Sequence, residues 1–296
     1  MTEMNRDMER VTTNGESLFE DDAREARRTE GRIDDLSERA DSGEIVFSDF
    51  LTPREQRFFA KHLARRGRSD KVRFYGGFTG AERRVACFLP DYLTELLEGH
   101  EEGSDEERLY LGESLDEAIE MLEIRGSGYR TLTHRDVLGA VLGLGIERDA
   151  IGDIILLDGD GSGREQPRIY LLAVSRLVPF LLSEFKKIGS DTVRVKKGCF
   201  PDGFVFEPKV RAISDTVASN RLDCVIGAIT NTAREKAQSL IRGGLVEIDY
   251  EPEDRPDARL NPPNVITVRG YGKFRLLTLG EVTKKGRLRL RAEQYL

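Results

Sequence analysis

Residues 219–246 read SNRLDCVIGAITNTAREKAQSLIRGGLV and carry the clearest folding signal in the chain. Four apolar residues recur at the spacing of one helical face, namely Leu222, Val225, Ile226 and Ile229. A second helix is expected to begin at a capping box in residues 232–235 (TARE) and to end at Gly243-Gly244, where glycine supplies a positive φ. Its buried stripe is expected to consist of Ala233, Ala237, Leu240 and Ile241. The stretch therefore predicts two short consecutive helices, each with one apolar face.

Alternating apolar residues follow this helix pair and predict a small curled sheet. The pairs that define its strands are Val246 and Ile248, Ile266 and Val268, Phe274 and Leu276, and Leu288 and Leu290. A glycine-rich turn, Gly270-Tyr271-Gly272, separates the second strand from the third. We expect residues 211–296 to form one domain from the two helices and this sheet.

The preceding segment, residues 111–200, alternates predicted strands and helices. Strands are expected at 118–125, 153–157, 168–174 and 192–196, and helices at 133–144 and 175–188. The resulting βαββαβ order indicates a split-βαβ, ferredoxin-like or RRM-like layer fold. Residues 118–125 are equally consistent with a helix that continues from Leu115.

Residues 46–110 are expected to form an N-terminal α/β unit. Residues 52–55 (TPRE) predict a capped helix start, strands at 71–75 and 83–89 flank the glycine-rich turn 76–80, and a helix follows at 91–98. The acidic stretch 98–117 is expected to be an exposed connection. Residues 1–45 are highly charged, so we expect an acidic tail that is disordered or a loosely attached helix, with order beginning near Ile45. The predicted fold class is α+β.

The composition excludes several classes of protein. The 296 residues include 39% hydrophobic and 33% charged side chains, which is typical of a globular chain with two or three domains. The three cysteines form no CxxC pair, which argues against a disulfide framework or a cysteine zinc site. No apolar run approaches the roughly 20 residues of a membrane span, and the acidic N-terminus lacks a secretion signal. We therefore expect a cytoplasmic protein without a membrane span.

The charge is distributed unevenly along the chain. The total is 46 Lys and Arg against 53 Asp and Glu, a balance of −7, whereas residues 264–292 contain eight Lys or Arg and a single Glu. Residues 91–123 show the reverse, with thirteen acidic residues and one Arg. Because a local basic face attracts phosphate even in an acidic protein, the C-terminal domain is the predicted contact for a polyanion. The acidic N-terminal half is the candidate surface for protein partners.

Polar residues on the predicted helix and strands define a candidate surface. Arg234, Gln238 and Arg242 are spaced by four and project from one side of the second helix, beside its positive end at Thr232. The residues that alternate with the apolar strand positions are Thr267, Arg269, Lys273, Arg275, Arg287, Arg289 and Arg291. Together they are expected to form one continuous basic groove. The alternative is a set of solvated faces and edge-strand cations, but their concentration in an acidic chain favours the groove.

The same residues resemble an S4 RNA-binding domain. That resemblance rests on three segments, 219–223 (SNRLD), 232–246 (TAREKAQSLIRGGLV) and 268–274 (VRGYGKF). Over about residues 46–296 the chain resembles the YlmH-like family, because three further segments occur in that family's order. These are 76–83 (GGFTGAER), 132–139 (LTHRDVLG) and 152–154 (GDI).

The resemblance implies a non-catalytic RNA-binding protein with an RRM-like middle domain and a C-terminal S4 domain. It also implies binding to structured rRNA and tRNA on the large ribosomal subunit, in ribosome-associated quality control of stalled peptidyl-tRNA complexes, without a cofactor. Related proteins are linked to bacterial cell division. The candidate RNA contacts are Arg221, Thr232, Arg234, Lys236, Gln238, Arg242, Arg269, Lys273 and Arg275.

The middle domain lacks the aromatic strand signature with which RRM domains stack bases. We expect Tyr170 to be a buried strand tyrosine and the domain to act as a scaffold or a contact for protein or RNA backbone. Five cations there either extend the positive surface or belong to a solvated helix end, namely Lys186, Lys187, Arg194, Lys196 and Lys197.

Signals of enzymatic activity are weak. His134-Arg135-Asp136 copies a kinase catalytic loop, but Val141 stands where the metal-binding Asn is needed. Residues 158–163 (DGDGSG) hint at a calcium loop, but Ile169 replaces its bidentate carboxylate. Residues 221–223 (RLD) resemble a triplet of pseudouridine synthases, and we interpret Asp223 as a structural residue that orients Arg221. We predict no catalytic, cofactor or metal residue; the alternative functions are an S4-targeted RNA-modifying enzyme and a cell-division-associated adaptor.

Overall fold

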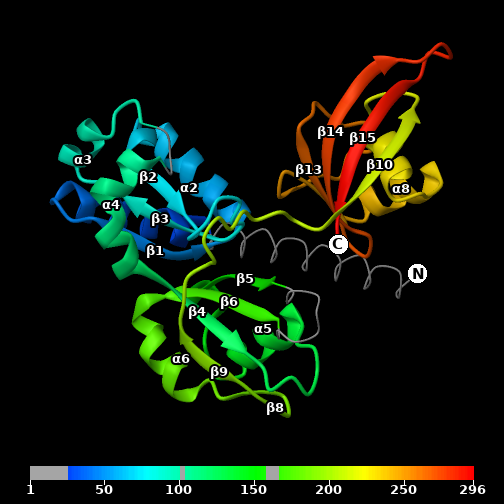
Figure 1. Cartoon of the computed structure of the whole chain (residues 1–296). Helices are drawn as coiled ribbons and strands as arrows, with labels where there is room; N and C mark the ends of the chain where they lie inside the picture. The colour runs from blue at the N-terminus through cyan, green and yellow to red at the C-terminus, as the bar shows by residue number, and fades with distance from the viewer. Residues whose placement is uncertain (1–25, 101–103, 158–166) are drawn as a thin grey trace, which may run out of the picture. The chain divides into compact units, whose positions relative to one another are not determined.

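The computed structural model describes residues 26–100, 104–157 and 167–296, and the calcium-like loop considered above lies outside them. These residues form a mixture of helices and antiparallel sheets, which is an α+β fold (Figure 1). The chain divides into two compact units, Met1–Phe204 and Val205–Leu296, and each is described by itself. None of the helices in the described ranges combines the length and apolar character needed to cross a bilayer.

The first part of unit 1 is a three-stranded antiparallel sheet between helices. Strands β1 (Val46–Leu51), β2 (Val72–Tyr75) and β3 (Arg84–Phe88) lie in the order β1-β3-β2. Helix α2 (Pro53–Arg65) begins at the predicted capping box: the Thr52 hydroxyl accepts from the Glu55 amide, and the Glu55 carboxylate accepts from the Thr52 amide. A short turn of 3₁₀ helix (Ser69–Lys71) precedes β2, and α3 (Asp91–Leu96) follows β3. The predicted strands and helices of this part are confirmed.

Residues 26–41 form a helix, which is one of the two alternatives expected for the N-terminal segment, but the prediction that order begins near Ile45 is wrong because this helix is packed and not loosely attached. Ile33, Leu36 and Ala40 lie on its inner side and are buried in one core cluster with residues of α2 and the sheet. His62 of α2 lies 2.9 Å from the Asp34 carboxylate, and Arg68 and Lys71 both donate to Asp41 at 2.7 Å. The helix is held by residues that come later in the chain. Residues 1–25 lie outside the described part.

The acidic stretch 98–117 is also not an exposed connection throughout. Helix α4 (Asp105–Ala118) starts at Ser104, whose hydroxyl accepts from the Glu107 amide. Leu111 of α4 is fully buried together with Leu93 and Leu97 of the α3 segment, so this helix covers the second face of the sheet. The high acidic content of this segment led to the prediction of an exposed connection, although Leu111 packs in an apolar core.

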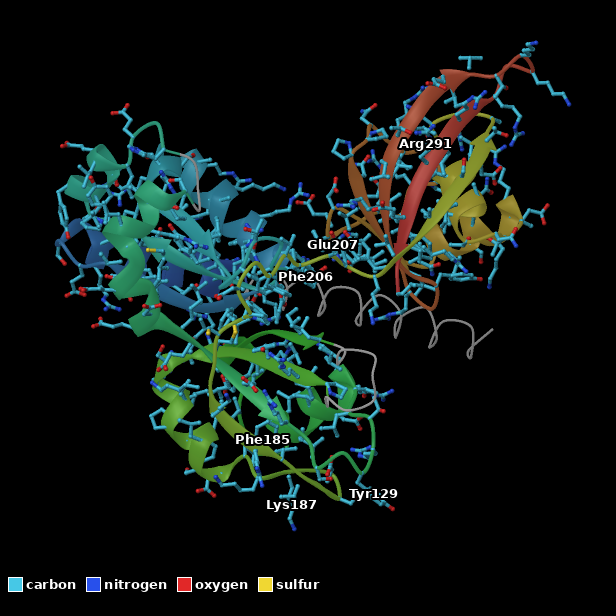
Figure 2. All side chains as sticks on the ribbon, in the orientation of Figure 1. Tyr129, Phe185, Lys187, Phe206, Glu207 and Arg291 are labelled. Atoms are coloured by element: carbon cyan, nitrogen blue, oxygen red, sulfur yellow. The ribbon has the colours of Figure 1, made fainter. Side chains whose placement is uncertain are left out.

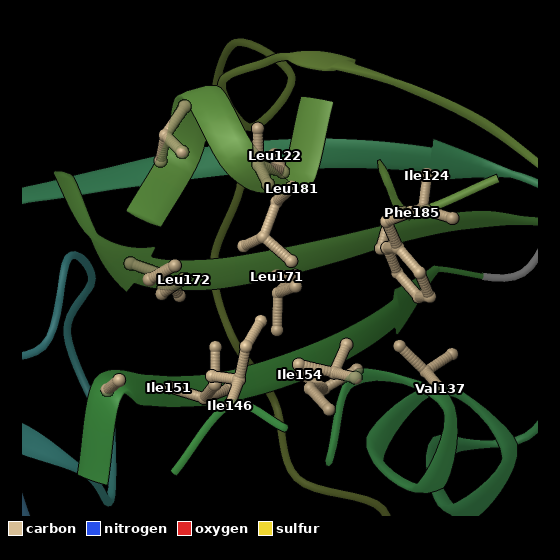
Figure 3. Close-up of a cluster of buried hydrophobic side chains, with 14 of the residues drawn as sticks. Leu122, Ile124, Val137, Ile146, Ile151, Ile154, Leu171, Leu172, Leu181 and Phe185 are labelled. Carbon is tan, nitrogen blue, oxygen red and sulfur yellow. The ribbon is translucent and has the colours of Figure 1, made fainter. Parts of the chain in front are cut away.

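The second part of unit 1 is a four-stranded antiparallel sheet in the order β5-β6-β4-β9. Its elements are β4 (Ile119–Arg125), α5 (His134–Leu142), a 3₁₀ turn (Arg148–Ala150), β5 (Ile151–Leu157), β6 (Arg168–Val174), a 3₁₀ turn (Ser175–Leu177), α6 (Val178–Glu184), β7 (Lys187–Ile188), β8 (Asp191–Thr192) and β9 (Arg194–Lys197). The predicted helix 175–188 ends earlier, at Glu184, and β7 then pairs with β8. Leu122, Leu171 and Phe185 belong to the core that α5 and α6 form with one face of the sheet (Figure 3). The predicted βαββαβ order of elements is confirmed.

Unit 2 is a six-stranded sheet covered on one face by two helices. Its elements are β10 (Val210–Val217), α7 (Leu222–Ile229), α8 (Arg234–Arg242), β11 (Val246–Ile248), β12 (Glu251–Pro252), β13 (Asn264–Val268), β14 (Gly272–Val282) and β15 (Leu288–Tyr295). The strand order is β10-β15-β14-β13-β11-β12. Apolar residues of α7, α8 and the inner sheet face form one core. Both helices and the strands β11, β13, β14 and β15 were predicted, whereas β10 and the two-residue β12 were not.

One predicted helix start in unit 2 is wrong. Helix α8 begins one residue later than the expected capping box, with Ala233 as a cap that provides no side-chain hydrogen bond. The Thr232 hydroxyl instead lies 2.9 Å from the Thr230 hydroxyl. Ala233 is exposed, so the buried stripe consists of Ala237, Leu240 and Ile241. Gly244 has the predicted positive φ, at 66°.

Candidate nucleic-acid interface

The helix pair of unit 2 gathers three predicted contact residues around one carboxylate. Arg221 precedes α7, Asp223 lies in its first turn, and α8 packs beside α7. Arg221 donates to both Asp223 oxygens, with Nε 3.1 Å from Oδ1 and Nη2 3.2 Å from Oδ2. Arg234 Nε and Gln238 Nε2 donate to Oδ2 at 3.0 and 2.8 Å. We call Arg221, Asp223, Arg234 and Gln238 the Asp223 cluster.

The Asp223 cluster holds two guanidinium groups at the surface. Asp223 is fully buried, whereas the side chains of Arg221 and Arg234 are 36% and 56% exposed. Burial by itself would raise the pKa of Asp223, but hydrogen bonds from Arg221, Gln238 and Arg234 outweigh it and keep the pKa well below the ordinary 3.8. The carboxylate therefore stays ionised and fixes both arginines. One negative charge against two positive charges leaves the cluster cationic toward solvent.

The rest of the helix surface adds cations next to the cluster. Lys236 and Arg242 of α8 are exposed and have no hydrogen-bond or ion-pair partner within the described ranges. Because Ala233 provides no side-chain cap, the first-turn amides of α8 beside Arg234 have no acceptor from the cap residue. The α7 start differs, since the amides of Leu222 and Asp223 donate to the carbonyls of Ala258 and Pro256. The start of α8, and not that of α7, is therefore suited to an anion.

The predicted sheet contacts lie on a different face from the helices. Phe274 and Leu276 are buried against α7 and α8, so Lys273 and Arg275, which alternate with them, project from the outer face of the sheet. Lys273 Nζ lies 5.1 and 5.0 Å from the ring centres of Tyr250 and Tyr295. Arg275 donates to Glu293 Oε2 from Nη2 at 2.5 Å. The expected single groove is therefore not present: the helix cations and the strand cations occupy opposite faces of unit 2.

Arg269 and Thr232 occupy intermediate positions. Arg269 is exposed at the end of β13, and its amide donates to the Leu245 carbonyl at 2.9 Å, just after α8 ends at Arg242. That bond joins the β13–β14 turn to the segment that follows α8. Thr232 pairs with Thr230 and contributes no cap.

Among the described residues, the middle sheet of unit 1 presents no base-stacking platform. Tyr170 is only 1% exposed, as predicted for a buried strand tyrosine. Its ring lies 5.0 Å from that of Phe200, which stacks on Phe204 at 4.0 Å and meets Phe78 edge-on at 5.5 Å. Phe200 therefore covers Tyr170 and is itself packed between Phe78 and Phe204.

The cations of the middle sheet are partly neutralised by its own carboxylates. Lys196 and Lys197 lie 3.2 and 2.5 Å from carboxylate oxygens of Glu123 and Glu120. Lys186 Nζ donates to the Leu182 carbonyl at 2.7 Å. Lys187 and Arg194 are exposed, and Lys187 projects outward at the β7–β8 turn (Figure 2). Of the five cations expected to extend a basic surface, Lys186, Lys196 and Lys197 therefore have partners within the domain.

The upstream sequence motifs meet inside unit 1 and have a structural role there. The amides of Glu82 and Arg83 donate to the Asp153 carboxylate, at 2.6 Å from Glu82. The buried Arg83 guanidinium donates to the carbonyls of Phe50 and Ile151 at 3.0 Å and of Arg148 at 3.2 Å. Residues 76–83 and 152–154 therefore join the N-terminal sheet to the middle sheet. Thr133 and Asp136 form a capping box at α5, so the kinase-like triplet 134–136 is the first turn of a helix.

No group of three or more His, Cys, Asp or Glu side chains that could hold a metal occurs in residues 26–100, 104–157 and 167–296. Of the cysteines, Cys87 is buried, Cys224 is half-buried and Cys199 is exposed. Burial raises the pKa of the Cys87 thiol, which makes it a packing residue and not a nucleophile.

Comparison with known proteins identifies relatives. A family model described as "Putative RNA-binding domain in YlmH" matches residues 113–201. A Bacillus subtilis (strain 168) protein named "Ribosome-associated protein quality control protein P2" is 26% identical over 252 residues, or 84% of this chain and 87% of the relative. The resemblance to the YlmH-like family is confirmed. A solved structure named "Cell division protein ylmH from Streptococcus pneumoniae" is 21% identical, covers 60% of this chain and 89% of that one, and has a TM-score of 0.38.

The YlmH match and the candidate contacts fall in different parts of the chain. The matched segment 113–201 runs from α4 to the residue after Phe200 and contains the middle sheet. All nine predicted contacts lie in unit 2. Sequence reasoning assigned Asp223 to Arg221 alone and missed its contacts with Arg234 and Gln238. The sequence could have predicted these contacts. Asp223 lies in the first turn of α7, and the neighbouring amphipathic helix α8 carries Arg234 and Gln238 on one side.

Proposed function

We propose that this chain is a non-catalytic RNA-binding protein that contacts structured rRNA and tRNA on the large ribosomal subunit. The proposal places it in ribosome-associated quality control of stalled peptidyl-tRNA complexes. The name of the Bacillus subtilis relative and the description of the matched domain support this role. The observation that carries it is the Asp223 cluster, which fixes two exposed guanidinium groups beside the uncapped start of α8.

The chemistry of this surface suits the backbone of folded RNA. Two guanidinium groups held by one carboxylate lose little conformational entropy when they bind a phosphate, because their positions are already fixed. Lys236 and Arg242 supply further cations, and Gln238 keeps an amide oxygen that can accept from a 2′-hydroxyl. No aromatic side chain belongs to the cluster, so recognition would follow RNA shape and not base identity.

Each domain has a part in this proposed role. Residues 211–296 act as an S4 domain, with α7 and α8 as its helix pair and β11, β13 and β14 as its core strands. Residues 111–200 act as an RRM-like domain, since the strand order β5-β6-β4-β9 with two helices on one face is that of a split-βαβ fold. Residues 46–110 form the N-terminal α/β unit, which would support the middle domain through Arg83 and Asp153.

The test removes cations that have no structural partner. Lys236→Ala combined with Arg242→Ala is expected to weaken binding to structured large-subunit rRNA. The slope of log affinity against log salt should fall by about 1 for each phosphate that the variant no longer neutralises. The melting temperature should stay unchanged, because both side chains are exposed and unpaired within the described residues. Filter binding at several salt concentrations measures the affinity and the slope.

A matched control removes two exposed arginines from α2, with Arg54→Ala and Arg65→Ala. This pair changes the net charge by the same amount but lies in unit 1. Equal affinities for the wild type and the α8 variant would refute the assignment, and so would equal reductions in the α8 and α2 variants.

A further inference from the structure

The hairpin formed by β14 and β15 ends in an ordered, strongly basic tip. The strands pair up to Val282 and Leu288, and residues 283–287 close the turn at the far end of unit 2 (Figure 1). Thr283 organises this turn: its amide donates to the Arg287 carbonyl at 2.7 Å, and its carbonyl accepts from the Gly286 amide at 2.9 Å. Gly286 has a φ of 75°, a conformation that glycine adopts without strain. The tip is therefore a defined turn and not a frayed end.

Five exposed cations occupy the tip and the adjoining part of β15, namely Lys284, Lys285, Arg287, Arg289 and Arg291. Arg289 lies 3.6 Å from Glu281, but both side chains are largely exposed, so this pair neutralises little. Arg287 Nε donates to the Thr216 hydroxyl at 2.9 Å. Lys284, Lys285 and Arg291 have no ion-pair partner among the residues that the structure describes. The hairpin thus keeps most of its positive charge available to a ligand.

Protection of a sheet edge does not explain these cations. Cations on an edge strand prevent pairing with other chains. However, β15 is an interior strand that pairs with β10 on one side and β14 on the other, so Arg289 and Arg291 do not lie on an edge strand. Lys284 and Lys285 lie in the turn, where no strand pairing is possible. Edge protection therefore does not account for this charge.

The hairpin cations face away from the Asp223 cluster. Leu290 is buried in the core shared with α7 and α8, and Arg289 and Arg291 flank it on β15, so they project from the opposite face of the sheet. The hairpin cations and the Asp223 cluster would therefore contact different phosphates. Arg275 and Lys273 lie on this outer face closer to the core, paired with Glu293 and with two tyrosine rings.

We propose that the tip and outer face of the β14–β15 hairpin form a second RNA-binding surface, which grips the phosphate backbone of an RNA duplex. The ligand class rests on the proposed function, and the surface itself rests on the hairpin's charge and topology. A two-stranded ribbon with lysines at its tip and arginines along one face can follow the phosphates that border a groove. Residues 282–291 include no aromatic side chain, so the tip is suited to contacts with the RNA backbone and not to base stacking.

The test uses a short RNA duplex of unrelated sequence as the probe, bound by the full chain. Lys284→Ala with Lys285→Ala should weaken binding several-fold and lower the salt slope by about 1 for each lysine removed. Arg291→Ala should do the same to a smaller extent, and Lys284→Arg with Lys285→Arg should retain binding. The α2 pair, Arg54→Ala with Arg65→Ala, controls for net charge, and circular dichroism confirms that each variant stays folded.

The outcomes separate this surface from the proposed function. If the tip variants bind the duplex and large subunits like the wild type while the Lys236 and Arg242 variant does not, the second surface is refuted and the proposed function stands. If all variants bind equally, both fail. If the tip variants lose binding to an acidic peptide of residues 91–123 but not to RNA, the hairpin is a protein contact and the proposal is wrong.

Discussion

At Asp223, one buried carboxylate decides the position of three polar side chains. Arg221 reaches it from the residue before α7, while Arg234 and Gln238 reach it from α8. A buried charge is tolerated only when donors surround it, and here four hydrogen bonds compensate for the missing hydration. Asp223, which is not itself a proposed RNA contact, therefore fixes the positions of three residues that are.

Asp223→Asn should separate the charge of this group from its shape. We expect the free energy of unfolding to fall by about 1–3 kcal/mol, because hydrogen bonds from two guanidinium groups to a carboxylate are weakened. RNA affinity should fall as well, since Arg221 and Arg234 lose their anchor. Urea unfolding and filter binding of the full chain measure the two effects. Unchanged affinity in a destabilised variant would assign Asp223 a purely structural role.

The same residue predicts a dependence of stability on pH. Its pKa in the folded chain is below the ordinary 3.8, so the ionised form stabilises the fold at neutral pH, and this contribution is lost progressively as the pH falls below about 4 toward the folded-state pKa. Between neutral pH and about pH 3, the wild type should lose more stability than Asp223→Asn. Parallel curves for the two proteins would contradict the depressed pKa.

At the scale of elements, local patterns predicted most helices and strands correctly and failed where distant residues decide. The pattern Thr-x-x-Glu occurs at Thr52 and at Thr232, but only Thr52 forms the capping box, because the Thr232 hydroxyl pairs with Thr230 instead. The helix 26–41 and α4 were missed because charge dominates their sequences, while their few apolar residues pack on elements formed later in the chain. Strand β10 was missed because its sequence is largely polar and lacks regular apolar alternation, so that its strand structure depends on pairing with β15.

The glycine-rich turn 76–80 depends on close packing, and a pair of glycine variants tests this. A Cβ on Gly76 would lie 2.7 Å from the Arg83 carbonyl oxygen and 2.3 Å from the Ala81 Cβ, so Gly76→Ala should lower the melting temperature. A Cβ on Gly112 within α4 meets nothing within 4 Å, so Gly112→Ala should raise stability by about 0.5–1 kcal/mol. Differential scanning calorimetry measures both. A melting temperature of Gly76→Ala equal to or above that of the wild type would show that the turn tolerates a side chain.

At the scale of the whole molecule, the charge separates between the two units. Unit 2 carries 16 Lys and Arg against 12 Asp and Glu, whereas unit 1 carries 30 against 41. The sequence predicted this asymmetry and the residues that carry it. The expected single groove overlooked that the apolar strand residues must face α7 and α8, which leaves the sheet cations on the opposite face.

The claim that RNA is bound through the α7–α8 surface is tested most directly by crosslinking. Cells are irradiated with ultraviolet light, large ribosomal subunits are isolated on sucrose gradients, and RNA-linked peptides of this chain are identified by mass spectrometry. The account predicts that the protein sediments with large subunits and that its crosslinked peptides include residues 221–242. Crosslinks confined to unit 1, or a protein that sediments away from the subunits, would contradict it.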